Sequence, residues 1–218
     1  GDMDFIAGNL GLNSRLQATE KEPVRLYYND FDDNGKKEQL LTYYIGGREI
    51  VFVSKDDLQK QLPAIKRKYL YAGDFAKAAV PDLFGQDKLK NSQVLTAEYF
   101  SNAILVNDGK MNFSLQPLPW LAQLTSYRDA VITNANDDDL PDVLLVGNYY
   151  DNNIQMGRYD ADFGTMLINQ GGGRFKVEGI NGLAIKGQVR HVAELKTKDQ
   201  VTYLFARNSD SIKLIRYK

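Results

Sequence analysis

Short apolar runs separated by polar turns cover most of the chain, and this pattern is typical of β-strands. Two clear examples are "GDMDFIAGN" at 1–9 and "LPDVLLVGN" at 140–148, which resemble each other and both end in Gly-Asn. Residues 189–218 offer three further strands joined by polar turns. The pattern predicts an all-β fold along most of the chain.

One segment, from about 54 to 95, departs from this pattern. Its apolar residues recur at the spacing of a helix face, and Ser54 followed by Asp57 is typical of a helix start. The residues at helical spacing are Leu58, Leu62, Ile65 and Tyr69. We therefore expect a helical insertion at about 54–95, packed outside the sheets.

Internal repetition explains the rest of the middle of the chain. The stretch "LVNDGKMNFSL" (105–115) matches "LINQGGGRFKV" (167–177) at an offset of 62 residues, and both read as strand, Asn-X-Gly turn and strand. Upstream, "NDFDDNGKKEQLLTYY" (29–44) matches "TNANDDDLPDVLLVGNYY" (133–150) at an offset of 104 residues. The excess of 42 residues agrees with a helical insertion within the first of two repeats.

The two ends of the chain read as partial repeats. Residues 1–9 correspond to a loop and strand without the preceding strand, and 189–218 lack an acidic loop. Repeated small sheets of this kind are typical of radial or solenoidal β arrays. We expect one domain over 1–218, built of β-propeller-type blades that form an incomplete or truncated propeller.

The two matched upstream stretches each contain an acidic loop in which oxygen-bearing side chains alternate. A hard cation such as Ca²⁺ is bound in this way, with a backbone carbonyl as a further ligand. The candidate ligands are Asp30, Asp32, Asn34, the carbonyl of Lys36 and Glu38 in the first loop, and Asn134, Asn136, Asp138, the carbonyl of Leu140 and Asp142 in the second.

An EF-hand is excluded because its twelfth position, a bidentate Glu, is Leu41 in one loop and Leu145 in the other. Asp, Asn and Gly are also ordinary turn residues, so a single loop of this type would favour a plain turn. The same spacing at two equivalent positions favours Ca²⁺ sites. The second loop has fewer carboxylates and no glycine, and is expected to bind more weakly.

These loops and the Asn-X-Gly hairpins resemble FG-GAP or VCBS repeats, the blades of integrin-α-type β-propellers. Four stretches are similar to the C-terminal part of large VCBS-repeat proteins of Bacteroidetes that are associated with an ASPIC/UnbV-type domain. They are "DFIAGNLGLNS" (4–14), "YYNDFDDNG" (27–35), "GRYDADFG" (157–164) and "LFARNSDSIKLIRYK" (204–218).

The resemblance implies a propeller fold, loops of the form D-x-D-x-D-G-x-x-D that hold structural Ca²⁺, and export to the periplasm, outer membrane or cell surface. This chain departs from the loop pattern at Glu38, Asn134, Asn136 and Asp139, where the pattern has Asp, Asp, Asp and Gly. These departures bear on Ca²⁺ occupancy more than on the fold.

The composition of the chain argues against several other classes of protein. The 27 basic and 28 acidic residues leave a net charge of −1, without the basic surface that a sequence-independent nucleic-acid binder needs. The sequence contains no run of 18 apolar residues, the length that would predict a membrane-spanning helix. The absence of cysteine excludes disulfides and thiol chemistry. The chain begins Gly-Asp-Met, which suggests a piece of a larger polypeptide.

We therefore expect a non-enzymatic, calcium-stabilised binding or scaffold module of an exported or cell-surface bacterial protein, with a protein or glycan ligand. Two alternatives stay open. One is a carbohydrate-active, sialidase-like hydrolase that uses Arg158, Tyr159 and neighbouring acids, and it requires Tyr159 and two carboxylates to converge in one open pocket. The other is a pure protein-interaction module with vestigial ion sites.

Overall fold

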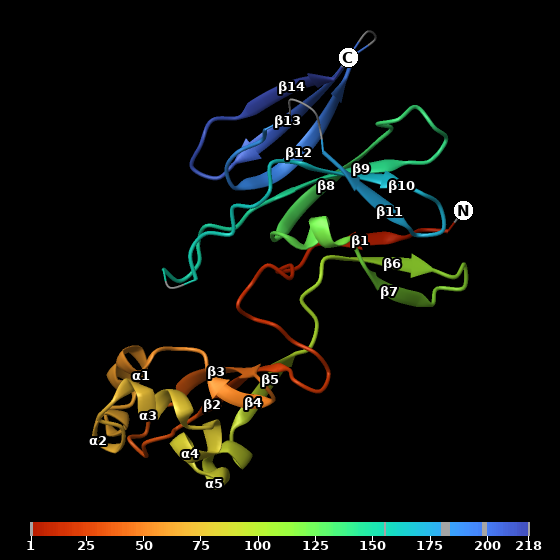
Figure 1. The fold of residues 1–218 in the computed structure, drawn as a ribbon. Coiled ribbons are helices and arrows are strands. Elements are labelled where there is room, and N and C mark those ends of the chain that lie inside the picture. The colour runs from red at the N-terminus through yellow and green to blue at the C-terminus, as the bar shows by residue number, and fades with distance from the viewer. Residues whose placement is uncertain (1, 155, 180–183, 198–199, 218) are drawn as a thin grey trace. The chain divides into compact units, whose positions relative to one another are not determined.

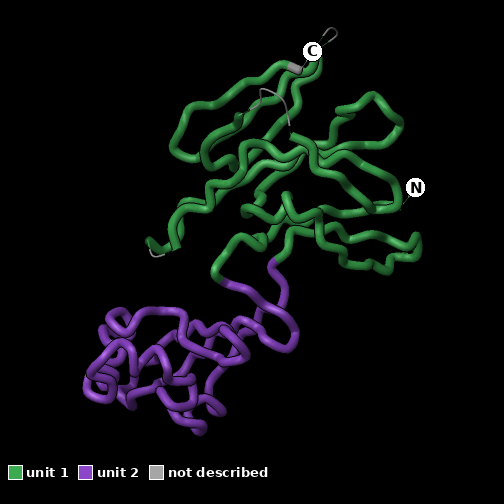
Figure 2. The backbone as a smooth tube through the Cα atoms, viewed as in Figure 1, with its two compact units in different colours: residues 1–15, 101–218 green, residues 16–100 purple. Residues whose placement is uncertain are grey.

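The chain folds into two compact units, one of which is formed by two separate stretches of the sequence. The computed structural model describes residues 2–154, 156–179, 184–197 and 200–217. Unit 1 comprises residues 1–15 and 101–218, and unit 2 comprises 16–100 (Figure 2). Unit 2 therefore interrupts unit 1 in the sequence.

The described part of unit 1 contains three antiparallel sheets (Figure 1). The first has the order β1-β6-β7, formed by Phe5–Ala7, Ala103–Asn107 and Phe113–Pro117. The second has the order β11-β10-β9-β8, formed by Phe175–Glu178, Thr165–Asn169, Asp142–Gly147 and Tyr127–Thr133. The third has the order β12-β13-β14, formed by Val189–Lys196, Val201–Arg207 and Lys213–Tyr217. A 3₁₀ helix, Trp120–Gln123, precedes β8.

The third sheet supplies the three C-terminal strands that the sequence predicts. Lys198, Asp199 and Lys218 of that predicted segment lie outside the described residues.

The hairpins β6–β7 and β10–β11 are structurally equivalent, as the 62-residue offset predicts. Asp4 Oδ1 accepts a hydrogen bond from the Asn107 N–H at 2.8 Å, and Asp142 Oδ1 accepts one from the Asn169 N–H at 2.9 Å. β1 therefore corresponds to β9, β6 to β10 and β7 to β11.

This pairing differs from the predicted repeat, which joined the first acidic loop to the hairpin at 105–115. That hairpin instead pairs with β1, through Phe5↔Leu105 and Ala7↔Ala103. The strands around the first acidic loop form a separate sheet in unit 2. Local patterns identified both pieces, but not the pairing between strands about 100 residues apart.

Apolar side chains pack between successive sheets of unit 1. Leu145 on β9 contributes to a cluster with Ile104 on β6, whereas its neighbour Leu144 contributes to a cluster with Phe205 on β13. β9 is therefore buried on both faces, because successive side chains of a strand point in opposite directions. This explains why "DVLLVG" (142–147) is apolar without alternation.

Unit 2 is a four-stranded antiparallel sheet with five short helices. The sheet has the order β4-β3-β2-β5, formed by Arg48–Val51, Glu38–Ile45, Val24–Asn29 and Gln93–Ala97. The helices are α1 (Lys55–Gln61), α2 (Ala64–Lys68), α3 (Ala72–Lys77), α4 (Val80–Phe84) and α5 (Gln86–Lys90). They lie within the segment where the sequence predicts helices, and the Ser54 Oγ caps α1 by accepting the Asp57 N–H at 3.2 Å.

The helices share one hydrophobic core with the sheet. Leu40 on β3 and Val51 on β4 are buried in the same cluster as Leu58 on α1, Ile65 on α2 and Leu83 on α4. The helices are thus part of the unit's core, in contrast to the expected insertion that packs outside a self-sufficient sheet.

The described residues therefore form a mostly β protein with four antiparallel sheets, none of which closes on itself. None of the helices described is long and apolar enough to cross a bilayer.

Candidate metal centre

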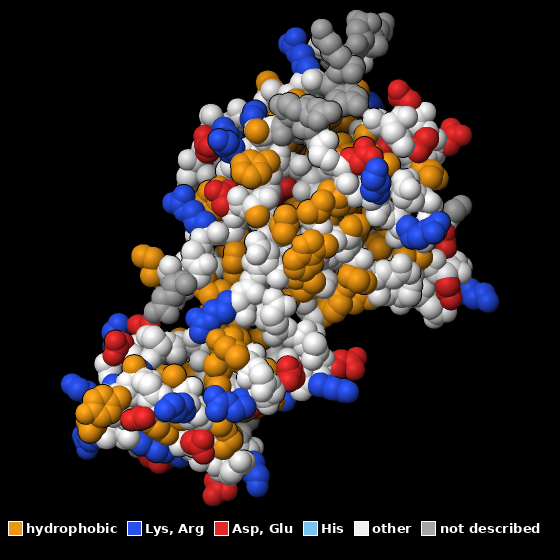
Figure 3. Space-filling model, in the orientation of Figure 1, with side chains coloured by type: hydrophobic (Ala, Val, Ile, Leu, Met, Phe, Trp, Pro, Cys, Tyr) orange, Lys and Arg blue, Asp and Glu red, His pale blue; other side chains and the backbone are white. Residues whose placement is uncertain are grey.

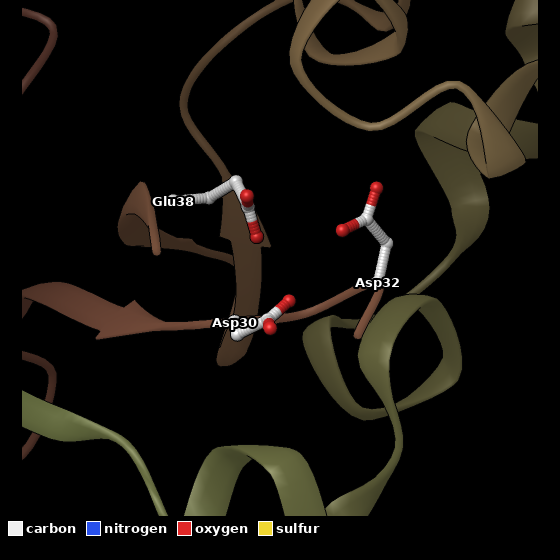
Figure 4. Close-up of side chains that lie close together, drawn as sticks. All are labelled: Asp30, Asp32 and Glu38. Carbon is white, nitrogen blue, oxygen red and sulfur yellow. The ribbon is translucent and has the colours of Figure 1, made fainter. Parts of the chain in front are cut away.

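Three carboxylates converge in the loop that joins β2 to β3. Asp30 follows the end of β2, Asp32 lies in the loop, and Glu38 is the first residue of β3. One oxygen atom from each lies within 4.8 Å of the others, and Figure 4 shows the carboxylates directed toward a shared space. The sequence spacing predicted this convergence.

The loop is wrapped around Asp30 by its own backbone. Asp30 Oδ2 accepts the Gly35 N–H at 2.7 Å, and Asp30 Oδ1 accepts the Asn34 N–H at 3.1 Å. The Asn34 side-chain oxygen accepts the Lys36 N–H at 2.8 Å, which keeps these two candidate ligands in the same turn. Asp33 adopts φ = 58°, a left-handed conformation that Asp tolerates better than most residues.

The loop is fixed to the core of unit 2 on both sides. Glu38, which is buried, accepts the Phe31 N–H at 2.8 Å, and the Phe31 ring packs 5.0 Å from that of Phe84 on α4. From α5, Lys88 Nζ donates to the Asp30 carbonyl at 2.9 Å and forms an ion pair with Asp33. Lys88, which sequence reasoning missed, stabilises the outside of the loop.

The charge in the centre is only partly compensated. Although desolvation opposes ionisation, hydrogen bonds from Gly35 and Asn34 and the charge of Lys88 lower the pKa of Asp30. Asp32 Oδ1 is buried and, among the described residues, accepts no hydrogen bond. A buried carboxylate oxygen without a donor is costly, and a cation would satisfy it. The residues present therefore fit Ca²⁺, which prefers several oxygen ligands in a flexible arrangement.

The second loop, between β8 and β9, has the same frame. Asp137 adopts φ = 57°, as Asp33 does at the equivalent position. Asp142 Oδ2 accepts the Ala135 N–H at 2.8 Å, which corresponds to the bond between Glu38 and Phe31. The predicted equivalence of the two loops is visible in their backbone.

The two loops differ in their side-chain hydrogen bonds. In the second loop, side-chain amide groups donate to oxygen atoms of the loop itself. Asn134 Nδ2 donates to the Asp138 carbonyl at 2.6 Å, and Asn136 Nδ2 donates to Asp138 Oδ2 at 2.7 Å. Asp138 Oδ1 accepts the Leu140 N–H at 2.7 Å. The two oxygens of the fully buried Asp142 accept backbone N–H groups of Ala135 and Asn169. The carboxylates of Asp138 and Asp142 are thus satisfied by donors of the protein itself.

The residues of the hydrolase alternative lie around a cavity of about 380 Å³ in unit 1. Arg158, Tyr159 and Asp160 line it, and Asp160 is the one carboxylate among its described lining residues. Asp162 points elsewhere, because its carboxylate accepts the N–H groups of Gly147 and Gly164 at 3.1 and 3.0 Å. Tyr159 and two carboxylates therefore do not converge on this cavity.

A buried asparagine that the sequence analysis did not single out supports this region. Asn148 Nδ2 donates to the carbonyls of Asp162 and Gly187 at 2.9 and 3.0 Å, and its Oδ1 accepts the Asp162 N–H and the Thr125 hydroxyl, each at 3.0 Å. The available signal was the Gly-Asn that follows the apolar strand, which recurs at Asn9.

Comparisons with protein-family models, with curated proteins and with solved structures found no match to this chain.

Proposed function

We propose that this chain is a non-enzymatic, calcium-stabilised binding or scaffold module of an exported or cell-surface bacterial protein. The observation that carries the proposal is the first acidic loop. Asp30, Asp32 and Glu38 face one centre, and the buried Asp32 Oδ1 lacks a donor among the described residues.

The proposal includes the arrangement of unit 1 as consecutive propeller-type blades. The matching hydrogen bonds of Asp4 and Asp142, and the apolar clusters on both faces of β9, support three sheets stacked as repeated units. In this proposal the described strands of the first blade correspond to β9, β10 and β11, those of the third correspond to β8, β9 and β10, and unit 2 is an insertion between β1 and β6.

Calcium in this proposal is structural. A cation between Asp30, Asp32 and Glu38 would join the end of β2 to the start of β3, because the three ligands come from the two strand ends and the loop between them. The second loop needs an ion less, since the Asn136 amide and the Leu140 N–H already donate to the two oxygens of the Asp138 carboxylate.

The partners proposed are a protein or a glycan. On the face shown in Figure 3, acidic and basic side chains are interspersed, without a large field of one sign. This distribution and the net charge of −1 support a partner other than nucleic acid.

Calcium should raise the melting temperature of unit 2, and Asp32→Ala should remove this effect. Binding to the folded state alone stabilises it by about 2.7 kcal/mol when calcium is 100-fold above Kd. For a unit of this size the shift is roughly 11–22 °C, at about 4–8 °C for each kcal/mol. Differential scanning calorimetry in EDTA and in millimolar calcium measures it. Magnesium should have little effect, because it requires a tighter octahedral ligand set.

The matched control is Asp138→Ala, which removes a carboxylate from the equivalent loop of unit 1 and should leave the calcium shift of unit 2 unchanged. In EDTA, Asp32→Ala should be at least as stable as the wild type, because the substitution removes a buried oxygen without a donor. Equal wild-type melting temperatures in EDTA and calcium would show that the loop is only a turn.

A further inference from the structure

The cavity of about 380 Å³ in unit 1 has the size of a small-ligand site. One wall is formed by residues 13–15, and the other by Met156 and residues 158–161. The two walls are joined by a hydrogen bond of 3.0 Å between the hydroxyls of Ser14 and Tyr159.

The guanidinium group of Arg158 is positioned by an aromatic ring and has N–H donors that a ligand could use. Its guanidinium carbon lies 4.9 Å from the centre of the Tyr150 ring, and within the described part of the chain it forms no hydrogen bond or ion pair. Stacking on a ring restricts the guanidinium while leaving its N–H donors available, and their planar geometry matches a carboxylate. Arg15 adds a second positive charge to the lining.

The remaining polar groups favour hydroxyl groups on the ligand. Asp160 Oδ1 accepts hydrogen bonds from the Tyr150 hydroxyl and from Asn148 Nδ2, which fixes its position, while Asp160 Oδ2 accepts none from the described residues. Tyr159 is held by two backbone hydrogen bonds of 2.9 Å with Tyr149. The hydroxyl pair of Ser14 and Tyr159 offers both donor and acceptor capacity.

We propose that this cavity binds an acidic saccharide, with the sugar carboxylate on Arg158 and sugar hydroxyls on Asp160, Ser14 and Tyr159. A free phosphate fits less well, because the cavity is much larger than a phosphate and the Asp160 carboxylate repels a dianion but accepts a sugar hydroxyl. This inference rests on the proposed function as a binding module and names its ligand class.

The test is calorimetric titration of the whole chain with a galacturonic acid trisaccharide, with the same trisaccharide after reduction of its carboxyl groups, and with inorganic phosphate. The acidic trisaccharide should bind at least about tenfold more tightly than its neutral counterpart. Arg158→Ala should abolish this preference, and Arg158→Lys should retain part of it, because lysine keeps the charge but loses the bidentate geometry. The matched control is Arg174→Ala on the β10–β11 turn, which should bind as the wild type does.

Equal binding of the acidic and neutral sugars, unchanged binding by Arg158→Ala, tighter binding of phosphate, or no binding at millimolar sugar would each overturn the proposal. The calcium shift of unit 2, measured on the same preparations, reports separately on the ion loop. A protein that shows the calcium shift without sugar binding would overturn only the ligand assignment.

Discussion

Leu58→Ala should lower the free energy of unfolding of unit 2 by about 2–5 kcal/mol. Leu58 on α1 is completely buried in the cluster that joins the helices to β3 and β4. Removing its side chain leaves a cavity against residues that pack from two sides. Calorimetry should show a lower unfolding temperature for unit 2 and an unchanged unfolding temperature for unit 1.

The same substitution should identify which calorimetric transition belongs to the ion loop, because Phe31 of that loop is in the same cluster as Leu58. The transition that Leu58→Ala lowers should be the one that calcium raises. Leu70→Ala is the matched control: Leu70 follows α2, its side chain is 77% exposed, and the change should stay within about 0.5 kcal/mol.

Replacing residues 55–90 by a short flexible linker extends this test. The deletion removes the helical part of the core and Lys88, so unit 2 should lose both its transition and its response to calcium. A deletion variant that keeps both would show that the sheet β4-β3-β2-β5 is stable without its helices.

The second large effect concerns Asp162 in unit 1. Burial raises the pKa of this side chain, which is 2% exposed, to about 6, and hydrogen bonds from Thr165, Gly164 and Gly147 only partly oppose the rise. The unfolded chain releases the proton near pH 4, whereas the folded protein retains it up to about pH 6.

The free energy of unfolding of unit 1 should therefore fall as the pH rises from 4 to 6. In this range the folded state binds more protons than the unfolded state, so increasing pH favours unfolding. The loss is roughly 3 kcal/mol, at 1.36 kcal/mol for each pH unit, and stability should level off above the folded pKa.

Chemical denaturation of the wild type and of Asp162→Asn at pH 4, 5, 6 and 7 measures this effect. The asparagine cannot titrate, so the difference between the two proteins should change by about 3 kcal/mol over the series, whatever the fixed effect of the substitution is. Parallel stability curves for the two proteins would mean that Asp162 ionises in the folded state as it does in the unfolded chain.

The elements that depend on local pattern could be predicted from the sequence. Asn107 and Asn169 begin the same type of hairpin because each is followed by Gly two residues later, where its side-chain oxygen accepts the glycine N–H. The helices at 55–90 follow from the apolar spacing that starts at Leu58.

The association of β1 with β6 could not be read from local pattern. Phe5 and Leu105 are paired in the sheet, but the whole of unit 2 lies between them in the sequence. The sequences just before and just after unit 2 look like ordinary strand ends. The informative signal was the likeness of residues 1–9 to 140–148, since β9 lies beside β10 and β1 lies beside the equivalent β6.

The candidate site was predictable to the same extent. The alternation of Asp30, Asp32 and Glu38 indicates their convergence, because alternate loop residues can face one centre. The hydrogen bonds within the second loop could not be predicted in the same way. They depend on the orientation of the Asn134 and Asn136 side chains, which is determined by packing. Replacement of Asp by Asn was the one hint in the sequence.

The interruption of unit 1 by unit 2 also has a consequence for the order in which the chain assembles. About 95 residues separate β1 from β6 in the sequence. Within unit 2, Val24 at the start of β2 is paired with Ala97 at the end of β5. Once that pair forms, the effective loop falls to about 20 residues, and the entropy cost of closing it falls by about 1 kcal/mol. The inserted unit thus becomes a folding aid for the sheet that it divides: its own collapse brings together two strands that are synthesised far apart in time.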